Sequence, residues 1–183
     1  WKIAVETFME CYHHIGAHAE TVEPSHPGRS TYTEDSHAGW TVCWEPLREN
    51  LKIEDVVGDS LPVFPTLTPE QLRLDGLVLV YPMTLYGLTP NRISVTGLLP
   101  VGPDKTLWRR NVLVPRAVTQ LPDFAEKVEK ARLIADRIAA EDLAVNDMQQ
   151  VGAASFTATM GRLSHLEKVV WQLADFVRAR VAD

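Results

Sequence analysis

Apolar and polar positions alternate along the middle of the chain and recur at helical spacing toward both ends. The alternation predicts β-strands, because successive side chains of a strand point to opposite faces. The expected strands are residues 37–47, 76–81, 85–88, 92–100 and 106–114. A turn cluster, Val101-Gly-Pro-Asp-Lys105, separates the last two strands and indicates an antiparallel hairpin.

The first segment predicts a helix. Residues 1–19 begin with alternation and change to helical spacing from about Thr7, which favours an extended lead-in followed by a helix. Gly16 lies where that helix is expected to end. Two segments rich in proline, polar residues and charge, residues 20–36 and 51–72, are expected to be irregular loops.

The last third of the chain is expected to be helical. Residues 123–150 contain neither proline nor glycine, and Asp123 stands at the expected N-cap. In the final helix, residues 163–182, a capping box is indicated by Ser164 and Glu167. Sequential strands followed by helices favour an α+β fold, with an antiparallel sheet covered on one face.

Composition narrows the class of protein. The 183 residues, 45% of them hydrophobic, suit one globular domain, and the net charge of −6 argues against a nucleic-acid groove. No apolar run approaches the roughly 18 residues of a membrane helix. Two cysteines, Cys11 and Cys43, allow neither a disulfide scaffold nor an all-cysteine metal site, and both are expected to be small core residues. The start at Trp1 suggests a piece of a longer protein.

The densest group of metal-binding side chains lies at residues 10–18, where three histidines and a glutamate fall within nine positions. His14 and His18 are four apart and would share one helical face. His13 and His18 are five apart and converge only if the helix ends between them, which Gly16 would permit.

A third ligand would have to come from elsewhere, and the later helix offers Glu141, Asp142 and Asp147. Two histidines and one carboxylate form the facial triad of non-haem Fe(II) oxygenases. The same donors occur in zinc hydrolases, although their usual His-Glu-x-x-His pattern is absent. A metal-free cluster of surface or core histidines stays open on the residues alone.

The opening stretch WKIAVETFMECYH, residues 1–13, resembles the WK-x-x-x-E-N-F-x-E-C-Y-H motif of the Rieske non-haem iron ring-hydroxylating oxygenases. The resemblance is to the C-terminal catalytic domain of the alpha subunit, where a second metal histidine follows five residues later, here His18. Weaker similarity continues through residues 80–82, 99–106, 141–142, 149 and 161–167. Thr7 departs from the motif, which often has asparagine there.

The resemblance implies that Fe(II) is held by His13, His18 and Asp142, with Asp147 as the other candidate for the third ligand. It implies that Glu10 bridges electron transfer from the Rieske cluster of a neighbouring subunit. The implied reaction is O2 activation that hydroxylates, or oxidatively demethylates, a small organic substrate, expected to be aromatic. The implied fold is a helix-grip (START/Bet v 1-like) domain, a curved antiparallel sheet packed against a long C-terminal helix.

The resemblance assigns the whole chain, residues 1–183, to the catalytic domain. The N-terminal Rieske domain is expected to be absent, because the two Cys-x-His pairs that hold its [2Fe–2S] cluster are missing and Cys11 and Cys43 could not supply them. The fragment alone is therefore expected to be inactive. Implied partners are a separate reductase or ferredoxin, two further copies in a homotrimer and, in some members, a beta subunit, all in the cytoplasm.

Two alternatives are kept. A metal-free helix-grip module would bind an apolar ligand without chemistry, but it would have no use for three convergent ligands. A zinc hydrolase would need a general base beside the metal, and Glu10 is the nearby candidate. The sequence does not show which apolar side chains face a pocket; the candidates are Phe8, Met9, Met83, Leu85 and Phe156.

Overall fold

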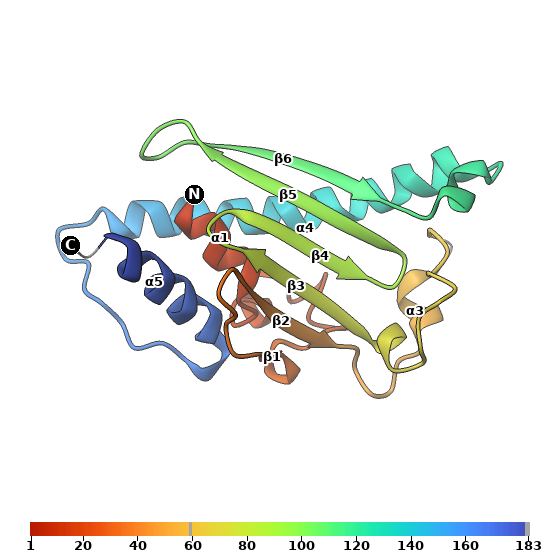
Figure 1. Cartoon of the computed structure of the whole chain (residues 1–183), viewed down its shortest axis with the longest axis horizontal. Coiled ribbons are helices and arrows are strands. Elements are labelled where there is room, and N and C mark those ends of the chain that lie inside the picture. The colour runs from red at the N-terminus through yellow and green to blue at the C-terminus, as the bar shows by residue number, and fades with distance from the viewer. Residues whose placement is uncertain (59, 182–183) are drawn as a thin grey trace.

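The structure is a computed structural model that describes residues 1–58 and 60–181. Its centre is a six-stranded antiparallel sheet whose strands follow one another in chain order (Figure 1). The strands are β1 (Tyr32–Thr33), β2 (Trp40–Pro46), β3 (Leu74–Val80), β4 (Thr84–Thr89), β5 (Arg92–Pro100) and β6 (Thr106–Leu113). Because every strand pairs with the next one, the sheet is a meander in which each connection joins neighbours.

The hairpin between β5 and β6 follows the expected pattern. Pro100 pairs with Thr106, and the backbone N–H of Val101 donates to the carbonyl of Lys105 at 2.9 Å. The five predicted strands are confirmed, with ends that differ by a few residues. The predicted loops contain short elements only: η1 (Gly28–Ser30) and β1 in the first, and α3 (Ile53–Val57) and η2 (Gln71–Arg73) in the second.

The first helix, α1 (Lys2–Met9), begins earlier than expected, so the extended lead-in is wrong. Val5 and Met9 lie four residues apart on one face of α1, and both are almost fully buried. Packing of this face against the core favours a helix from the second residue onward. After a short turn, the single-turn helix α2 (His14–Ala17) follows.

The longest helix is α4 (Phe124–Ala153), which runs along the long axis of the molecule (Figure 1). A short 3-10 helix, η3 (Arg116–Gln120), leads into it from the sheet. Asp123 occupies the predicted N-cap position of α4, although its side chain makes no capping hydrogen bond. Helix α4 packs against α1 and α2, so residues more than one hundred positions apart in the sequence lie side by side.

The last helix, α5 (Lys168–Val181), starts later than expected because a 3-10 turn, η4 (His165–Glu167), precedes it. The predicted capping box is confirmed: the Ser164 hydroxyl accepts the N–H of Leu166, and the Glu167 carboxylate accepts the N–H of Ser164. The expected end at Ala182 lies outside the described residues. Among the helices of the described residues, none combines the length and hydropathy that a bilayer crossing requires.

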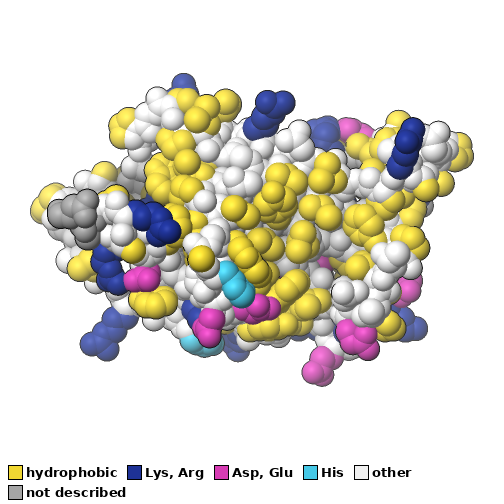
Figure 2. Space-filling view, in the orientation of Figure 1, with side chains coloured by type: hydrophobic (Ala, Val, Ile, Leu, Met, Phe, Trp, Pro, Cys, Tyr) yellow, Lys and Arg dark blue, Asp and Glu magenta, His cyan; other side chains and the backbone are white. Residues whose placement is uncertain are grey.

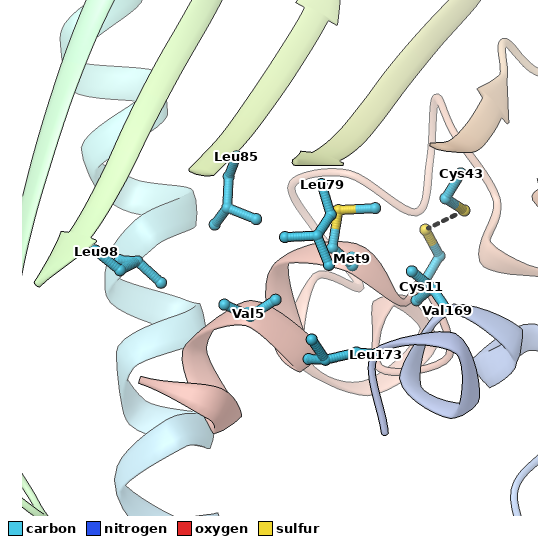
Figure 3. Close-up of a cluster of buried hydrophobic side chains, with 9 residues drawn as sticks. All are labelled: Val5, Met9, Cys11, Cys43, Leu79, Leu85, Leu98, Val169 and Leu173. Carbon is cyan, nitrogen blue, oxygen red and sulfur yellow. Dashed lines mark hydrogen bonds between the residues drawn. The ribbon is translucent and has the colours of Figure 1, made fainter. Parts of the chain in front are cut away.

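The main core joins α1, α5 and one face of the sheet (Figure 3). Its buried members are Val5, Met9, Cys11, Cys43, Leu79, Leu85, Leu98, Val169 and Leu173. The α+β fold with helices against one antiparallel sheet is thereby confirmed; its long helix is α4, and the shorter α5 follows it. On the face seen in Figure 2, further hydrophobic side chains gather over the middle of the molecule. The packing of Met9 and Cys11 in the main core fixes the end of α1, where the candidate site begins.

Candidate metal centre

The turn between α1 and α2 carries the first part of the site. Glu10 follows the last residue of α1 in an extended conformation. Its carboxylate accepts hydrogen bonds from the backbone N–H groups of Tyr12 at 2.5 Å and His13 at 3.3 Å. The other carboxylate oxygen lies 2.7 Å from Nδ1 of the His13 ring. Glu10 therefore shapes the turn and orients the His13 imidazole at the same time.

His13 and His18 stand at the two ends of α2, as its N-cap and C-cap. Their ring centroids lie 4.9 Å apart, so the two rings do converge. The helix break expected at Gly16 is absent, because Gly16 lies inside α2 and its φ is not positive. Since α2 is a single turn, cap residues at both of its ends can direct their rings toward α4.

The third group of the site is Asp142, on the inward side of α4. Its Oδ1 atom lies 2.9 Å from Nε2 of His18 and 3.4 Å from Nε2 of His13. One ligand atom from each of these three residues falls within 4.8 Å of the others. Asp147, the other expected candidate, is exposed five residues further along α4 and does not belong to this group.

Glu141 holds His18 from the side opposite Asp142. A Glu141 oxygen lies 2.7 Å from Nδ1 of His18 and accepts the hydroxyl of Thr21 at 2.6 Å. Arg137, one turn earlier in α4, lies 3.6 Å from the second oxygen. Each ring of the pair thus has a carboxylate on Nδ1 and turns Nε2 toward Asp142, the arrangement in which outer carboxylates fix the tautomer of metal-ligating histidines.

Electrostatics favour positive charge at this place. Burial lowers the pKa of His13, but hydrogen bonds to Asp142 and Glu10 outweigh burial and raise it to about 9. The pKa of His18 is raised as well, since hydrogen bonds to Asp142 and Glu141 outweigh its burial. Burial raises the pKa of Asp142, yet the two histidines reverse that effect and lower it. A site that attracts protons to neighbouring histidines in this way also suits a divalent cation.

His14, the other histidine of the helical-face argument, lies beside this centre, with its ring 5.1 Å from that of His13 and 5.5 Å from that of His18, but it contacts a different carboxylate. Its Nε2 lies 3.5 Å from the carboxylate of Glu45 on β2, and its ring is almost perpendicular to that of His13. Burial and the neighbouring His13 lower the pKa of His14 to about 3. The Cys11 thiol donates to Glu45 at 3.3 Å, so a second group of polar side chains forms there. Sequence reasoning missed this group, because Glu45 carries no local signal that connects it to residues 11–14.

The whole chain, residues 1–183, matches the family model of the ring hydroxylating alpha subunit (catalytic domain). The chain belongs to this family. The predicted membership is thus confirmed, and a catalytic domain of a Rieske oxygenase alpha subunit is what the fold and the match together describe. A comparison with curated protein sequences gives no match.

Two similar solved structures have the same fold. One is a quaternary ammonium Rieske monooxygenase, described in connection with carnitine oxidation by gut microbiota and inter-subunit electron transfer, with 19% identity and a TM-score of 0.68. The other is the quaternary ammonium Rieske monooxygenase CntA in complex with an inhibitor, with 19% identity and a TM-score of 0.62. The alignments cover 98% and 96% of this chain but only 46% of each of those chains.

The apolar residues that were candidates for a pocket wall differ in their surroundings. Met9 and Leu85 are buried members of the main core, and Phe8 and Met83 pack against it. Phe156 is fully exposed. Thr7, where the alpha-subunit motif often has asparagine, is buried, and its hydroxyl has no hydrogen-bond partner among the described residues.

Proposed function

We propose that this chain is the catalytic domain of an oxygenase that binds Fe(II) through His13, His18 and Asp142 and oxidises a small organic substrate. The observation that carries the proposal is the convergence of two imidazoles and one carboxylate, with ligand atoms within 4.8 Å of one another, in a chain of the ring-hydroxylating alpha-subunit family. This donor set is the facial triad that leaves coordination positions open in non-haem iron enzymes.

The donor chemistry fits the ion. With Nδ1 protonated and donating to a carboxylate, each ring keeps the lone pair of Nε2 for a metal. Glu10 fixes this tautomer for His13, and Glu141 fixes it for His18. Iron bound at this site by His13, His18 and Asp142 would supply O2 activation beside the substrate. The proposal includes both hydroxylation and oxidative demethylation. The two similar solved structures are named as quaternary ammonium Rieske monooxygenases, so the reaction is not restricted to aromatic rings.

Glu10 is proposed as the bridge for electron transfer. Its carboxylate contacts the ring of His13 and the backbone of the turn, and the residue is only 8% exposed. Tyr12 and Ile15, close by in the chain, are large and about half exposed, which suits an adjoining subunit. As members of this family use them, the proposal also includes a Rieske [2Fe–2S] domain, a reductase or ferredoxin and a trimeric assembly, in some members with a beta subunit.

A cavity of about 240 Å³ is the proposed place for the substrate, because one of its lining residues hydrogen-bonds Glu141. It is lined by Thr21, which contacts Glu141, and by Ile134 and Ile138 of α4, together with the polar side chains of Asp75 and Arg92. The three proposed ligands are not among its lining residues. A mixed apolar and polar wall of this size suits a small organic molecule with one polar group.

In the zinc-hydrolase alternative, Glu10 is badly placed to act as the general base. Both oxygens of Glu10 are engaged by the turn and by Nδ1 of His13, on the side of the ring away from Nε2. A general base has to reach the water on the open side of the metal. The geometry therefore favours Glu10 as an orienting and bridging group.

Metal content after anaerobic Fe(II) loading tests the proposal. We expect about one iron per chain in the wild type and a loss of stoichiometric iron in His13→Ala, His18→Ala and Asp142→Ala. Asp147→Ala, on the exposed side of α4, is the matched control and should keep its iron. Iron that survives Asp142→Ala but not Asp147→Ala would refute the ligand set, and a folded wild type without iron would favour the metal-free ligand-binding module.

A further inference from the structure

A second group of potential metal-binding side chains lies next to the first, where the α1–α2 turn meets β2. Cys11, His14 and Glu45 each place one ligand atom within 4.8 Å of the others, and all three residues are buried. Cys43, two residues before Glu45 on β2, adds a second buried thiol, with its Sγ 3.9 Å from Sγ of Cys11. The family's iron ligands include none of these four residues.

Three of the six separations among these four residues match a tetrahedral zinc site. Zinc bonds of about 2.0 Å to nitrogen or oxygen and 2.3 Å to sulfur place neighbouring ligand atoms roughly 3.3–3.8 Å apart. The structure gives 3.3 Å between Cys11 Sγ and Glu45 Oε1, 3.5 Å between His14 Nε2 and Glu45 Oε1, and 3.9 Å between the two sulfurs. The ligand atoms of Cys11, His14 and Glu45 therefore already lie at ligand spacing, whereas the Cys43 thiol has that spacing to Cys11 alone and would have to turn toward the ion.

The surroundings of His14 are those of a metal ligand. Its Nδ1 lies 3.3 Å from the backbone carbonyl of His26, an acceptor that fixes the Nδ1–H tautomer and leaves Nε2 free on the side of Glu45. Gly28 packs closely against the turn, since a Cβ at this position would lie 2.3 Å from the carbonyl oxygen of Cys11 and 3.3 Å from Cβ of His14. The backbone of residue 28 thus packs directly on the turn that carries two of the four side chains.

Charge balance points the same way. Glu45 is 7% exposed, and no lysine or arginine in the described residues forms an ion pair with it. Burial of a carboxylate without a cation is costly. A divalent ion would supply the missing positive charge, and the mixture of sulfur, nitrogen and oxygen donors favours zinc over the harder cations.

We propose that Cys11, Cys43, His14 and Glu45 bind a structural zinc ion. Binding would release the two thiol protons to solvent, with no change in oxidation state, and four protein ligands would leave the ion closed to substrate. The ion would tie the turn to β2. Because the adjacent His13 and His14 contact different carboxylates, one turn would serve two neighbouring metals, iron through the first histidine and zinc through the second.

Metal analysis of the full chain tests this proposal separately from the iron proposal. The reduced wild type is loaded with Zn²⁺, dialysed against a competing chelator and analysed for zinc; in parallel it is loaded with Co²⁺ and examined for the sulfur-to-cobalt charge-transfer absorption that only thiolate ligands give. We expect about one zinc per chain. Cys11→Ser and Glu45→Gln should lose it and His13→Ala should keep it, with the exposed His165→Gln as a further control.

Circular dichroism identifies variants that fail to fold, and in that event the cobalt spectrum of the wild type decides. Zinc that leaves with His13→Ala but stays in Cys11→Ser would overturn the proposal, because the ion would then occupy the other centre. A folded, reduced wild type without zinc or without the charge-transfer absorption would overturn it too, as would a mass showing Cys11 and Cys43 already joined as a disulfide. Zn²⁺ can also occupy the His13, His18 and Asp142 centre, and zinc bound there is recognised by its loss in His13→Ala. The zinc that His13→Ala keeps and Cys11→Ser loses tests this proposal, and Fe(II) loading tests the other.

Discussion

The carboxylate of Glu141 offers a sharp test of how the proposed iron ligands are oriented. It accepts the Nδ1–H of His18 at 2.7 Å, and the Thr21 hydroxyl and the Arg137 guanidinium hold it in place. The change Glu141→Gln keeps the size of this side chain but removes its charge. The amide can also present its NH2 group to Nδ1, which would favour the tautomer that protonates Nε2 and blocks the metal.

The magnitude follows from the role of such outer carboxylates. Their loss costs about 10–100-fold in metal affinity, which corresponds to about 1.4–2.8 kcal/mol. His18 is only 3% exposed and Glu141 only partly so, so solvent screening of their hydrogen bond is limited and we expect a value in the upper half of that range. The free energy of unfolding of the metal-free protein should change less, because Thr21 can still donate to the amide oxygen.

Anaerobic titration with Fe(II) against a competing chelator measures the effect. Glu126→Gln is the matched control, because Glu126 lies on the same helix, is 67% exposed and forms an ion pair with Lys130 across one turn. We expect the control to bind iron as the wild type does. An iron affinity of Glu141→Gln within twofold of the wild type would refute the argument that this carboxylate orients His18.

Three further predictions concern stability, each measured by chemical denaturation. Leu79→Ala, at a fully buried core position, should lower the free energy of unfolding by about 2–5 kcal/mol, whereas Leu99→Ala, 57% exposed, should change it by less than about 1; equal effects would contradict the core assignment. Gly28→Ala should lower it by about 1–3 kcal/mol, because the new Cβ would lie 2.3 Å from the Cys11 carbonyl oxygen; an unchanged midpoint would show that the loop yields freely. Burial, with the nearby charge of Glu45, raises the pKa of Asp75 from 3.8 to about 8, so the folded state keeps a proton that the unfolded state loses, and stability should fall as pH rises from about 4 to 8. Asp75→Asn should remove that pH dependence and raise the free energy of unfolding at pH 9 by about 2 kcal/mol. This is less than the full pKa shift implies, because 21% of the Asp75 side chain is exposed to solvent. If the variant is no more stabilised at pH 9 than at pH 4, the assignment is refuted.

Most helices and strands could be predicted from the spacing of hydrophobic residues along the sequence. Strands β2 to β6 and the long helix α4 follow from alternation and from the absence of proline and glycine, which act over a few neighbouring residues. The error at the chain start has the same origin. Ile3 and Val5 fit both a strand and a helix over so short a segment, and only the burial of Val5 and Met9 on one helical face decides between them.

The candidate site divides along the same line. Glu10, His13 and His18 lie within nine residues, so the sequence by itself determined that they would be close along the chain. The break expected at Gly16 was wrong: the turn lies before His13, where the Glu10 carboxylate accepts backbone hydrogen bonds, and His13 and His18 cap a single helical turn. The sequence also determined the family, since the opening motif requires no knowledge of the fold. The choice of Asp142 over Asp147 came from resemblance, and helical spacing gave no ground for it.

Only the tertiary structure decided which partners these residues meet. Asp142 lies 124 positions from His18, and Cys11 lies 34 positions from Glu45, yet both pairs are in contact. A hydrophobic period says which face of a helix or strand is buried but not what it is buried against, because the packing of α4 and β2 on the first turn depends on the summed burial of many side chains. That packing sends His13 to one group of ligands and His14 to another, a distinction that two adjacent histidines in a sequence do not carry.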